Sequence, residues 1–232
     1  MLSLNLPRGA LDVLCLGAHP DDIEIGCGGT LLRLGRRDAT TVSALVMSGT
    51  PDRVEESRGA LAAFAGIDDA RFLDFPDGRL PSRWDDVKQA LEDHAAARAT
   101  PDLVLAPRVD DAHQDHRLLG QLAPTVWRDS LVLHYEIPKW DGDTGQPTHY
   151  VGLSEDDARW KFQLLDKHFP SQRDRDWWDE ELFLGLLRVR GVECRHRYAE
   201  GFFATKVLVD IEEAAQRHDS GRHRSDDRER ES

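Results

Sequence analysis

Short apolar segments alternate with helix-like segments from residue 11 to residue 137 of this chain. The apolar segments have the length and composition of buried strands, and they cover residues 11–18, 41–50, 71–75, 102–107 and 131–137. Apolar residues at helical spacing predict helices between them, over residues 29–36, 53–65, 82–97 and 116–128. This order predicts right-handed βαβ units. We therefore expect an α/β fold, a Rossmann-like three-layer sandwich with a mostly parallel sheet.

The segment from 138 to 150 is rich in Gly and Pro and is interpreted as a surface loop. Alternatively it is a lid over a substrate, because Trp140 and Tyr150 have flat rings that suit a sugar.

The rest of the chain supplies two more helices and a last strand, predicted over residues 154–168, 177–190 and 202–210. The residues after this strand are charged and have little apolar content. We expect residues 1–210 to form a single domain and residues 211–232 to be a disordered tail.

Composition excludes several classes of protein. The 232 residues include 43 acidic and 30 basic side chains, a formal net charge of −13, which argues against a nucleic-acid partner. The cysteines Cys15, Cys27 and Cys194 form no CxxC pair, so neither a disulfide framework nor a thiolate zinc site is expected. No signal peptide is recognised, and no segment has the roughly 20 apolar residues that span a bilayer. We expect a cytoplasmic protein.

The first motif is GAHPDD at residues 17–22, directly after the first predicted strand. Pro20 stiffens the turn between the histidine and the aspartates. Asp21 and Asp22 are adjacent, so their side chains diverge, and one can bind a metal while the other faces the open side. Alternatively one of them only caps the next helix. That alternative leaves His19 unexplained.

The second motif is HQDH at residues 113–116, shortly after the fourth predicted strand. His113 and His116 are three residues apart, which places them on one face of a helical turn. Asp115 lies between them and could orient a ring nitrogen. An exposed, polar start of a helix is the alternative interpretation.

Both motifs lie at or beyond the carboxyl ends of strands, where parallel sheets form their sites. Together they offer two histidines and a carboxylate to one ion and leave one position open, as in catalytic zinc sites. Other divalent ions suit such ligands as well. A bound ion lowers the pKa of water to about 7 and polarises a carbonyl group. A spare carboxylate and a spare imidazole can then act as base and acid, which suits amide hydrolysis.

A glycine-rich stretch at residues 26–30 follows the first motif. Its spacing does not match the G-x-G-x-x-G pattern of dinucleotide-binding loops, and the acidic residues beside it would repel a pyrophosphate. These glycines are therefore expected to permit close packing of a helix on the sheet.

The two motifs resemble the signature of the PIG-L, or LmbE-like, family of zinc-dependent N-acetylglucosaminyl deacetylases. That signature is AHPDD followed by HPDH or HxDH, and here it stands as Ala18–Asp22 and His113–His116. Further matching strings are the glycine run at 26–30, the R-x-x-E pair Arg53 and Glu56, the FPDG turn at 75–78 and a closing strand at 198–206.

The resemblance implies a ligand set and a general base. His19, Asp22 and His116 would bind Zn²⁺, and Asp21 would remove a proton from the attacking water.

The resemblance also implies four further roles. His113 would be the general acid or would stabilise the oxyanion, with Asp115 holding its ring. Arg53 and Asp77 match positions that contact sugar hydroxyls in some members. A surface ion pair between Arg53 and Glu56 is the alternative for the arginine.

The chain departs from the family pattern at two positions. Gln114 replaces the usual proline of HPDH. Asp111 stands where some members have a tyrosine that polarises the carbonyl, so His113 or another donor would have to take over that task.

We therefore expect a hydrolase that removes the N-acetyl group from an N-acetylglucosamine or other N-acetylhexosamine conjugate. Such conjugates arise in the biosynthesis of glycans, glycoconjugates and glycosylated natural products. The expected partner is a small amino-sugar conjugate, and a homo-oligomer is compatible with the family. The alternatives are an amidase of the same fold that acts on a larger conjugate, a non-catalytic sugar- or metal-binding module, and a nucleotide-binding regulator.

Overall fold

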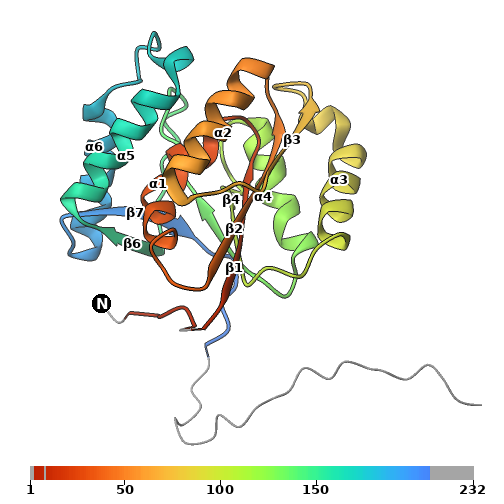
Figure 1. Cartoon of the computed structure of the whole chain (residues 1–232), viewed down its shortest axis with the longest axis horizontal. Helices are drawn as coiled ribbons and strands as arrows, with labels where there is room; N and C mark the ends of the chain where they lie inside the picture. The colour runs from red at the N-terminus through yellow and green to blue at the C-terminus, as the bar shows by residue number, and fades with distance from the viewer. Residues whose placement is uncertain (1–2, 8, 210–232) are drawn as a thin grey trace, which may run out of the picture.

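The strands form one seven-stranded sheet with the order β3-β2-β1-β4-β5-β7-β6 (Figure 1). The computed structural model describes residues 3–7 and 9–209. The parallel part of the sheet consists of β1 (Leu11–Gly17), β2 (Thr40–Ser48), β3 (Ala70–Phe75), β4 (Leu103–Pro107) and β5 (Leu131–Tyr135). The predicted Rossmann-like, mostly parallel sheet is confirmed.

The last two strands of the sheet run differently from the prediction. β7 (Tyr198–Phe203) is antiparallel to both β5 and β6 (His149–Leu153). The last strand was predicted too late in the sequence, and β6 was not predicted. Both strands are short, and the buried charged residue Glu200 lies inside β7. A charge in the middle of a strand conceals the apolar pattern from which strands are recognised.

Helices cover both faces of the sheet. On one face lie α1 (Asp22–Leu34), α2 (Pro51–Ala65) and α5 (Glu155–His168), and on the other lie α3 (Trp84–Ala96) and α4 (Gln114–Val126). The sixth helix, α6 (Glu180–Cys194), packs beside α5 and β7. Residues of β1 alternate between the two faces, because Val13 and Cys15 join the core under α1 whereas Leu14 and Leu16 join the core under α4.

The starts of α1 and α3 differ from the prediction. α1 starts at Asp22 instead of residue 29, and it continues through a kink at Cys27. The helix predicted over 82–97 begins later, at Trp84, because residues 80–83 form a 3-10 turn in which Ser82 donates its hydroxyl to the Arg79 carbonyl. The first turns of α1 were missed, because the glycines at 26, 28 and 29 weaken the helical pattern there.

The glycines of α1 permit the close packing predicted for them. A Cβ atom on Gly26 would lie 2.1 Å from the Tyr135 ring, and one on Gly28 would lie 2.8 Å from the Phe64 ring. Both distances are too short for non-bonded carbon atoms, so only glycine allows α1 to lie this close to β5 and α2. This close packing sets the distance between the sheet and the start of α1, which carries the first motif.

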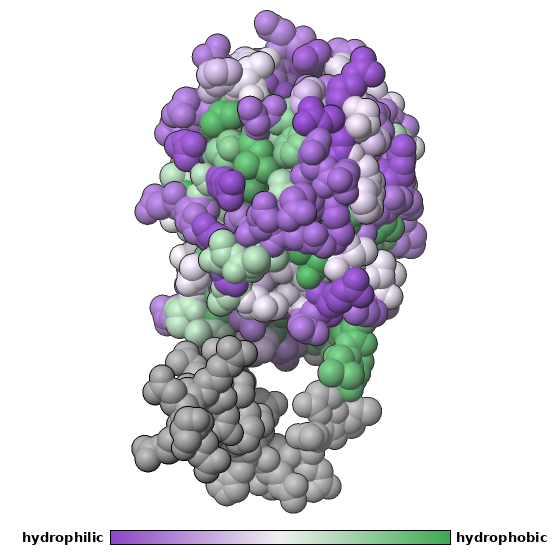
Figure 2. Space-filling view, turned by 90° about the vertical axis from the view of Figure 1, so that its right-hand side faces the viewer, coloured by the Kyte–Doolittle hydropathy of each residue, from purple (hydrophilic) through white to green (hydrophobic). Residues whose placement is uncertain are grey.

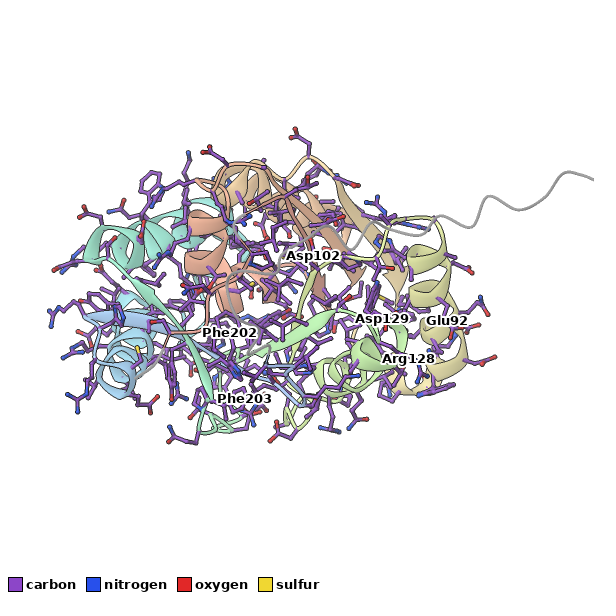
Figure 3. The ribbon with its side chains drawn as sticks, turned by 90° about the horizontal axis from the view of Figure 1, so that it is seen from below. Glu92, Asp102, Arg128, Asp129, Phe202 and Phe203 are labelled. Carbon is purple, nitrogen blue, oxygen red and sulfur yellow. The ribbon has the colours of Figure 1, made fainter. Side chains whose placement is uncertain are left out.

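The two ends of the sheet differ in what they carry. Asp102, Arg128 and Asp129 lie at the amino ends of β4 and β5, the end that faces the viewer in Figure 3. Both His/Asp motifs follow carboxyl ends of strands and therefore lie at the opposite end. The side seen in Figure 2 is mostly hydrophilic, with a hydrophobic patch in its upper part and a second hydrophobic group at the lower right.

The predicted disordered tail at 211–232 lies outside the described residues. Within residues 3–7 and 9–209, no helix is both long enough and apolar enough to span a membrane.

Candidate active site

The two motifs meet at the carboxyl ends of β1 and β4. Nδ1 of His19 lies 3.1 Å from Nε2 of His116, although 97 residues separate them in the sequence. The carboxylate of Asp22 lies beside both rings, with Oδ1 3.1 Å from His116 Nε2 and Oδ2 3.5 Å from His19 Nδ1. One nitrogen of each ring and both carboxylate oxygens therefore face a common point.

The backbone around Asp21 sets this arrangement. Asp21 has φ 98°, in the left-handed region that non-glycine residues rarely adopt. This conformation turns the chain sharply into α1, and Oδ2 of Asp22 accepts hydrogen bonds from the backbone N–H groups of Ala18 and His19 at 2.9 and 2.8 Å. Asp22 is thus held in place and points back over the end of β1. Neither aspartate caps α1 in the usual way, because the Asp21 side chain makes no capping bond.

The spacing of these atoms fits a bound cation. Zinc bonds of about 2.0–2.2 Å at tetrahedral angles would place ligand atoms roughly 3.3–3.5 Å apart. The separations of 3.1–3.5 Å between these ligand atoms are close to that range. Burial alone would lower the pKa of His19, yet the Asp22 carboxylate, together with hydrogen bonds to Asp115 and Asp77, raises it to about 12. Despite burial, the Asp22 carboxylate also raises the pKa of His116. The carboxylates of this buried site thus favour positive charge between them.

Other donor sets share His19. Ligand atoms of His19, His113 and His116 lie within 4.8 Å of one another, and so do those of His19, Asp77 and Asp115. The set of His19, Asp22 and His116 is preferred because it combines two ring nitrogens with a carboxylate. The first of the other sets has no anionic ligand, and in the second Asp115 already accepts hydrogen bonds from two backbone N–H groups. It is also the set that the family resemblance implied.

The second nitrogen of His19 faces carboxylates as well. Nε2 lies 3.0 Å from Oδ1 of Asp77 and 3.2 Å from Oδ2 of Asp115. Asp115 is fully buried and also accepts hydrogen bonds from the backbone N–H groups of Gly78 and Leu80, at 2.8 and 3.0 Å. Its carboxylate therefore orients His19. Among the described residues, the carboxylate has these contacts and no hydrogen bond to the ring of His113, the partner that the sequence suggested.

His113 is oriented by the backbone instead. It caps α4, and its Nδ1 accepts a hydrogen bond from the N–H of Asp115 at 3.3 Å. In a neutral ring the proton then resides on Nε2. Burial, followed by the charges of His116 and His19, lowers the pKa of His113. The ring centroid lies 4.9 Å from that of His19 and 4.5 Å from that of His116. A neutral N–H donor therefore stands at the edge of the ligand cluster.

Asp21 and Arg53 form an ion pair beside the cluster. Nη2 of Arg53 donates to Oδ2 of Asp21 at 2.6 Å. Burial raises the pKa of Asp21 to about 7, although Arg53 acts to lower it. A carboxylate with such a pKa can take up a proton near neutral pH, as a general base must.

A cavity of about 170 Å³ opens next to this pair. It is lined by Pro20, Ser48, Gly49, Thr50, Arg53, Phe75 and Asp77. Both predicted substrate residues, Arg53 and Asp77, are among them. The alternative pair between Arg53 and Glu56 is not formed within the described residues, because Glu56 accepts hydrogen bonds from the backbone N–H and the hydroxyl of Ser171.

The departures from the family pattern have structural counterparts. Nε2 of Gln114 donates to the carbonyl of Gly78 at 3.1 Å, so it ties the second motif to the FPDG turn. Oδ2 of Asp111 lies 3.3 Å from Nδ1 of His116, so the carboxylate contacts the His116 ring.

The sequence did not single out Lys139, whose Nζ lies 3.3 Å from Nδ1 of His116 and 3.4 Å from Oδ1 of Asp111. A single lysine in a loop has no spacing that could have revealed this position.

The two rings of the predicted lid lie in different places. Trp140 is 62% exposed, and its Nε1 donates to Asp176 at 2.8 Å while its ring contacts Trp177 edge-on. Tyr150 belongs to β6, and its hydroxyl donates to the Pro147 carbonyl. Trp140 is thus held against the segment of Asp176 and Trp177, whereas Tyr150 is part of the sheet.

Comparison with known proteins agrees with this geometry. The family model named PIG-L, described as GlcNAc-PI de-N-acetylase, matches residues 14–127. The uncharacterized deacetylase YaiS of Escherichia coli is 35% identical over 179 residues, which cover 72% of this chain and 93% of YaiS. The chain belongs to the PIG-L family. The sequence-based assignment to this family is therefore confirmed.

Two further relatives support the PIG-L assignment. A diacetylchitobiose deacetylase of Thermococcus kodakarensis is 28% identical over 232 residues, covering 86% of this chain and 85% of that protein. The crystal structure of the conserved protein TT1542 from Thermus thermophilus superposes with a TM-score of 0.68 at 25% identity, covering 88% of this chain and all of that one. PIG-L membership and these named relatives identify the chain as a member of a deacetylase family.

Proposed function

We propose that this PIG-L protein is a divalent-metal-dependent hydrolase that removes the acetyl group from an N-acetylhexosamine unit of a conjugate. The observation that carries the proposal is the convergence of His19, Asp22 and His116 on one point, with Asp21 beside them. The name of the Thermococcus relative supports an N-acetylated amino sugar as the substrate class. Zn²⁺ suits the two nitrogens and the carboxylate, and other divalent ions suit them too.

A bound divalent cation would supply Lewis-acid chemistry, polarising the amide carbonyl and lowering the pKa of a water molecule. Asp21 accepts the proton of the attacking water. Arg53 keeps the Asp21 carboxylate turned toward the site through its 2.6 Å hydrogen bond. Water adds to the carbonyl carbon, the C–N bond breaks, and acetate and a free amine are the products.

His113 acts on the carbonyl oxygen and the leaving nitrogen of the substrate. Because its Nδ1 accepts from the Asp115 backbone, its Nε2–H is free to donate to the carbonyl oxygen or to the leaving nitrogen. Its lowered pKa keeps the ring neutral, so that it acts first as a hydrogen-bond donor. The proton that Asp21 takes from water can then return to the amine as it leaves.

The cavity beside Arg53 and Asp77 supports the choice of a polar ring as substrate. Its volume of about 170 Å³ suits a unit of monosaccharide size rather than a large acyl group. Arg53 and Asp77 offer a donor and acceptors for hydroxyl groups, and Phe75 offers an apolar surface. A conjugate would leave its remaining part outside the cavity.

The proposal is tested by measuring acetate released from N-acetylglucosamine, diacetylchitobiose and an aryl N-acetylglucosaminide, with metal-free protein and after addition of Zn²⁺. Release should require the metal. Asp21→Asn should reduce kcat by about 10²–10⁴-fold, the range typical for loss of a general base, without weakening metal binding. Asp52→Asn, an exposed acidic residue in the first turn of α2, is the matched control.

Other results would contradict the proposal in recognisable ways. Full activity of the Asp21→Asn protein would refute the role of the base. Release of a bulkier acid from an N-acylated conjugate, without acetate release, would favour an amidase of the same fold. Sugar binding without turnover of any substrate would favour a binding module.

A further inference from the structure

The two histidines of the proposed ligand set differ in what contacts the ring nitrogen that faces away from the proposed metal. Among the described residues, the recorded polar contacts of His19 Nε2 are two carboxylates, those of Asp77 and Asp115. Nδ1 of His116 instead lies 3.3 Å from an oxygen of Asp111 and 3.3 Å from Nζ of Lys139. An acceptor and a donor thus compete for the same ring nitrogen.

This competition decides which nitrogen of His116 carries the proton. If Nδ1–H donates to Asp111, Nε2 has a free lone pair that faces His19 and Asp22 and can bind a cation. If Nδ1 accepts from Lys139, the proton resides on Nε2 and points into the site, 3.1 Å from Asp22 Oδ1. A ring in that second form cannot be a ligand, because metals bind the unprotonated nitrogen.

We propose that Asp111 and Lys139 act in opposition on His116, with Asp111 positioning the ring in its cation-binding form and Lys139 favouring the form that does not bind. This inference rests on the proposed metal dependence, and it assigns a role to the aspartate that occupies the tyrosine position of some family members. Both are positioning residues, since they act through His116.

The contacts of Asp111 suit this role. It is 1% exposed, and its other oxygen accepts a hydrogen bond from the backbone N–H of His113 at 2.8 Å, which fixes the carboxylate behind the ring. Asp111 therefore contacts the outer ring nitrogen of His116 in the way that Asp115 contacts that of His19. Carboxylates in this position fix the ring orientation of a ligating histidine and strengthen its binding.

The contacts of Lys139 place it between two anions. Its Nζ lies 3.4 Å from Oδ1 of Asp111 and 3.3 Å from Oδ2 of Asp141, and its side chain is 12% exposed. The carboxylate of Asp141 attracts the ammonium group away from the His116 ring, whereas the contact with Nδ1 of His116 holds it toward the site. Because Lys139 brings a positive charge next to a ligand of a cation, its removal should strengthen metal binding.

The experiment measures the dissociation constant of Zn²⁺ by competition with a chromophoric chelator, using the full-length metal-free protein. Asp111→Asn should weaken binding by about 10–100-fold, the range found when such partners of metal ligands are lost. Lys139→Met should strengthen it. Asp110→Asn, whose carboxylate contacts Arg108 instead of a ligand, and Lys88→Met, whose lysine pairs with Glu92 on α3, should leave it unchanged.

Opposite signs for the two variants support the inference. Unchanged binding in Asp111→Asn, or weaker or unchanged binding in Lys139→Met, would overturn it. If the Asp111 variant does not fold, as judged by thermal unfolding without metal, the sign of the Lys139→Met effect decides alone. The readout is independent of acetate release, so failure of the proposed deacetylation with opposite effects on Zn²⁺ would leave this inference standing.

Discussion

Replacing Gly26 by alanine would show how strongly the first motif depends on the packing of α1. The new Cβ would lie 2.1 Å from Cδ2 and 2.6 Å from Cγ of Tyr135. Tyr135 is fully buried, and its hydroxyl donates to the Leu16 carbonyl at 2.5 Å, so the ring cannot turn aside without losing that bond. The helix and the strand must therefore move apart.

The expected effect follows from three contributions. Overpacking costs about 3 kcal/mol at the upper end of its usual range. A lost or weakened hydrogen bond adds about 1 kcal/mol. The higher helix propensity of alanine offsets about 1 kcal/mol. We therefore expect Gly26→Ala to reduce the free energy of unfolding by about 3 kcal/mol, and to weaken metal binding because Asp22 is carried by the displaced helix.

Gly185→Ala is the matched control, because Gly185 lies within α6 and no atom would come within 4 Å of its added Cβ. This variant should gain up to about 1 kcal/mol from helix propensity alone. Urea unfolding of both variants at 25 °C, with equal m-values, measures the difference. If the two substitutions shift the free energy of unfolding in the same direction, the close packing of Gly26 against Tyr135 does not determine the position of the first motif.

Three further predictions concern substrate contact, a buried ion pair and pH. Trp140→Ala should raise KM for diacetylchitobiose several-fold and leave kcat for N-acetylglucosamine unchanged, because an exposed ring next in sequence to Lys139, which contacts His116, suits stacking of an outer sugar. Trp160→Ala on α5 should change neither value in the same kinetic assay. Lys161→Met should lower the free energy of urea unfolding by about 3–5 kcal/mol, because Glu200 remains buried without its 2.7 Å partner; a loss below about 1 kcal/mol would contradict this reasoning. Burial lowers the pKa of His134 from its ordinary 6.5, so its contribution to stability is complete above pH 6.5 and is lost as the pH falls through the lowered value. Urea unfolding between pH 5 and 8 should show a larger loss of stability toward low pH in the unchanged protein than in His134→Asn, which keeps other histidines whose pKa is lowered, such as His113.

The sequence predicted the parts of the fold and the site that depend on local patterns. Apolar runs followed by helical spacing revealed the parallel strands, and the two His/Asp strings at their ends revealed the residues that converge. His19 and His116 come within 3.1 Å because β1 and β4 are neighbours in the sheet. Neighbouring parallel strands bring their carboxyl ends together, so the meeting of the motifs follows from topology.

Pairings between distant residues could not be predicted in the same way. Asp115 stands next to His116 in the sequence and was expected to orient the ring of His113. The start of α4 instead turns its carboxylate toward His19 and the Gly78–Leu80 turn. Lys139 reaches His116 only because its loop returns across the end of β4. Such contacts depend on loop conformation, which has no periodic signal in the sequence.

The position of the first motif also depends on residues outside the family match. Glu200 on β7 accepts hydrogen bonds from the backbone N–H groups of Gly29 and Thr30 at 2.7 and 2.6 Å, and Lys161 on α5 bridges Glu200 to the carbonyl of Ile25. The family model ends at residue 127, before either charged residue. These bonds fasten the middle of α1, where glycines leave the helix without side chains that could anchor it. The antiparallel strands and α5 therefore hold in place the helix whose first residue, Asp22, faces the proposed metal. The buried carboxylate of Glu200 made β7 hard to recognise in the sequence. The same carboxylate connects the last part of the chain to the helix that carries Asp22.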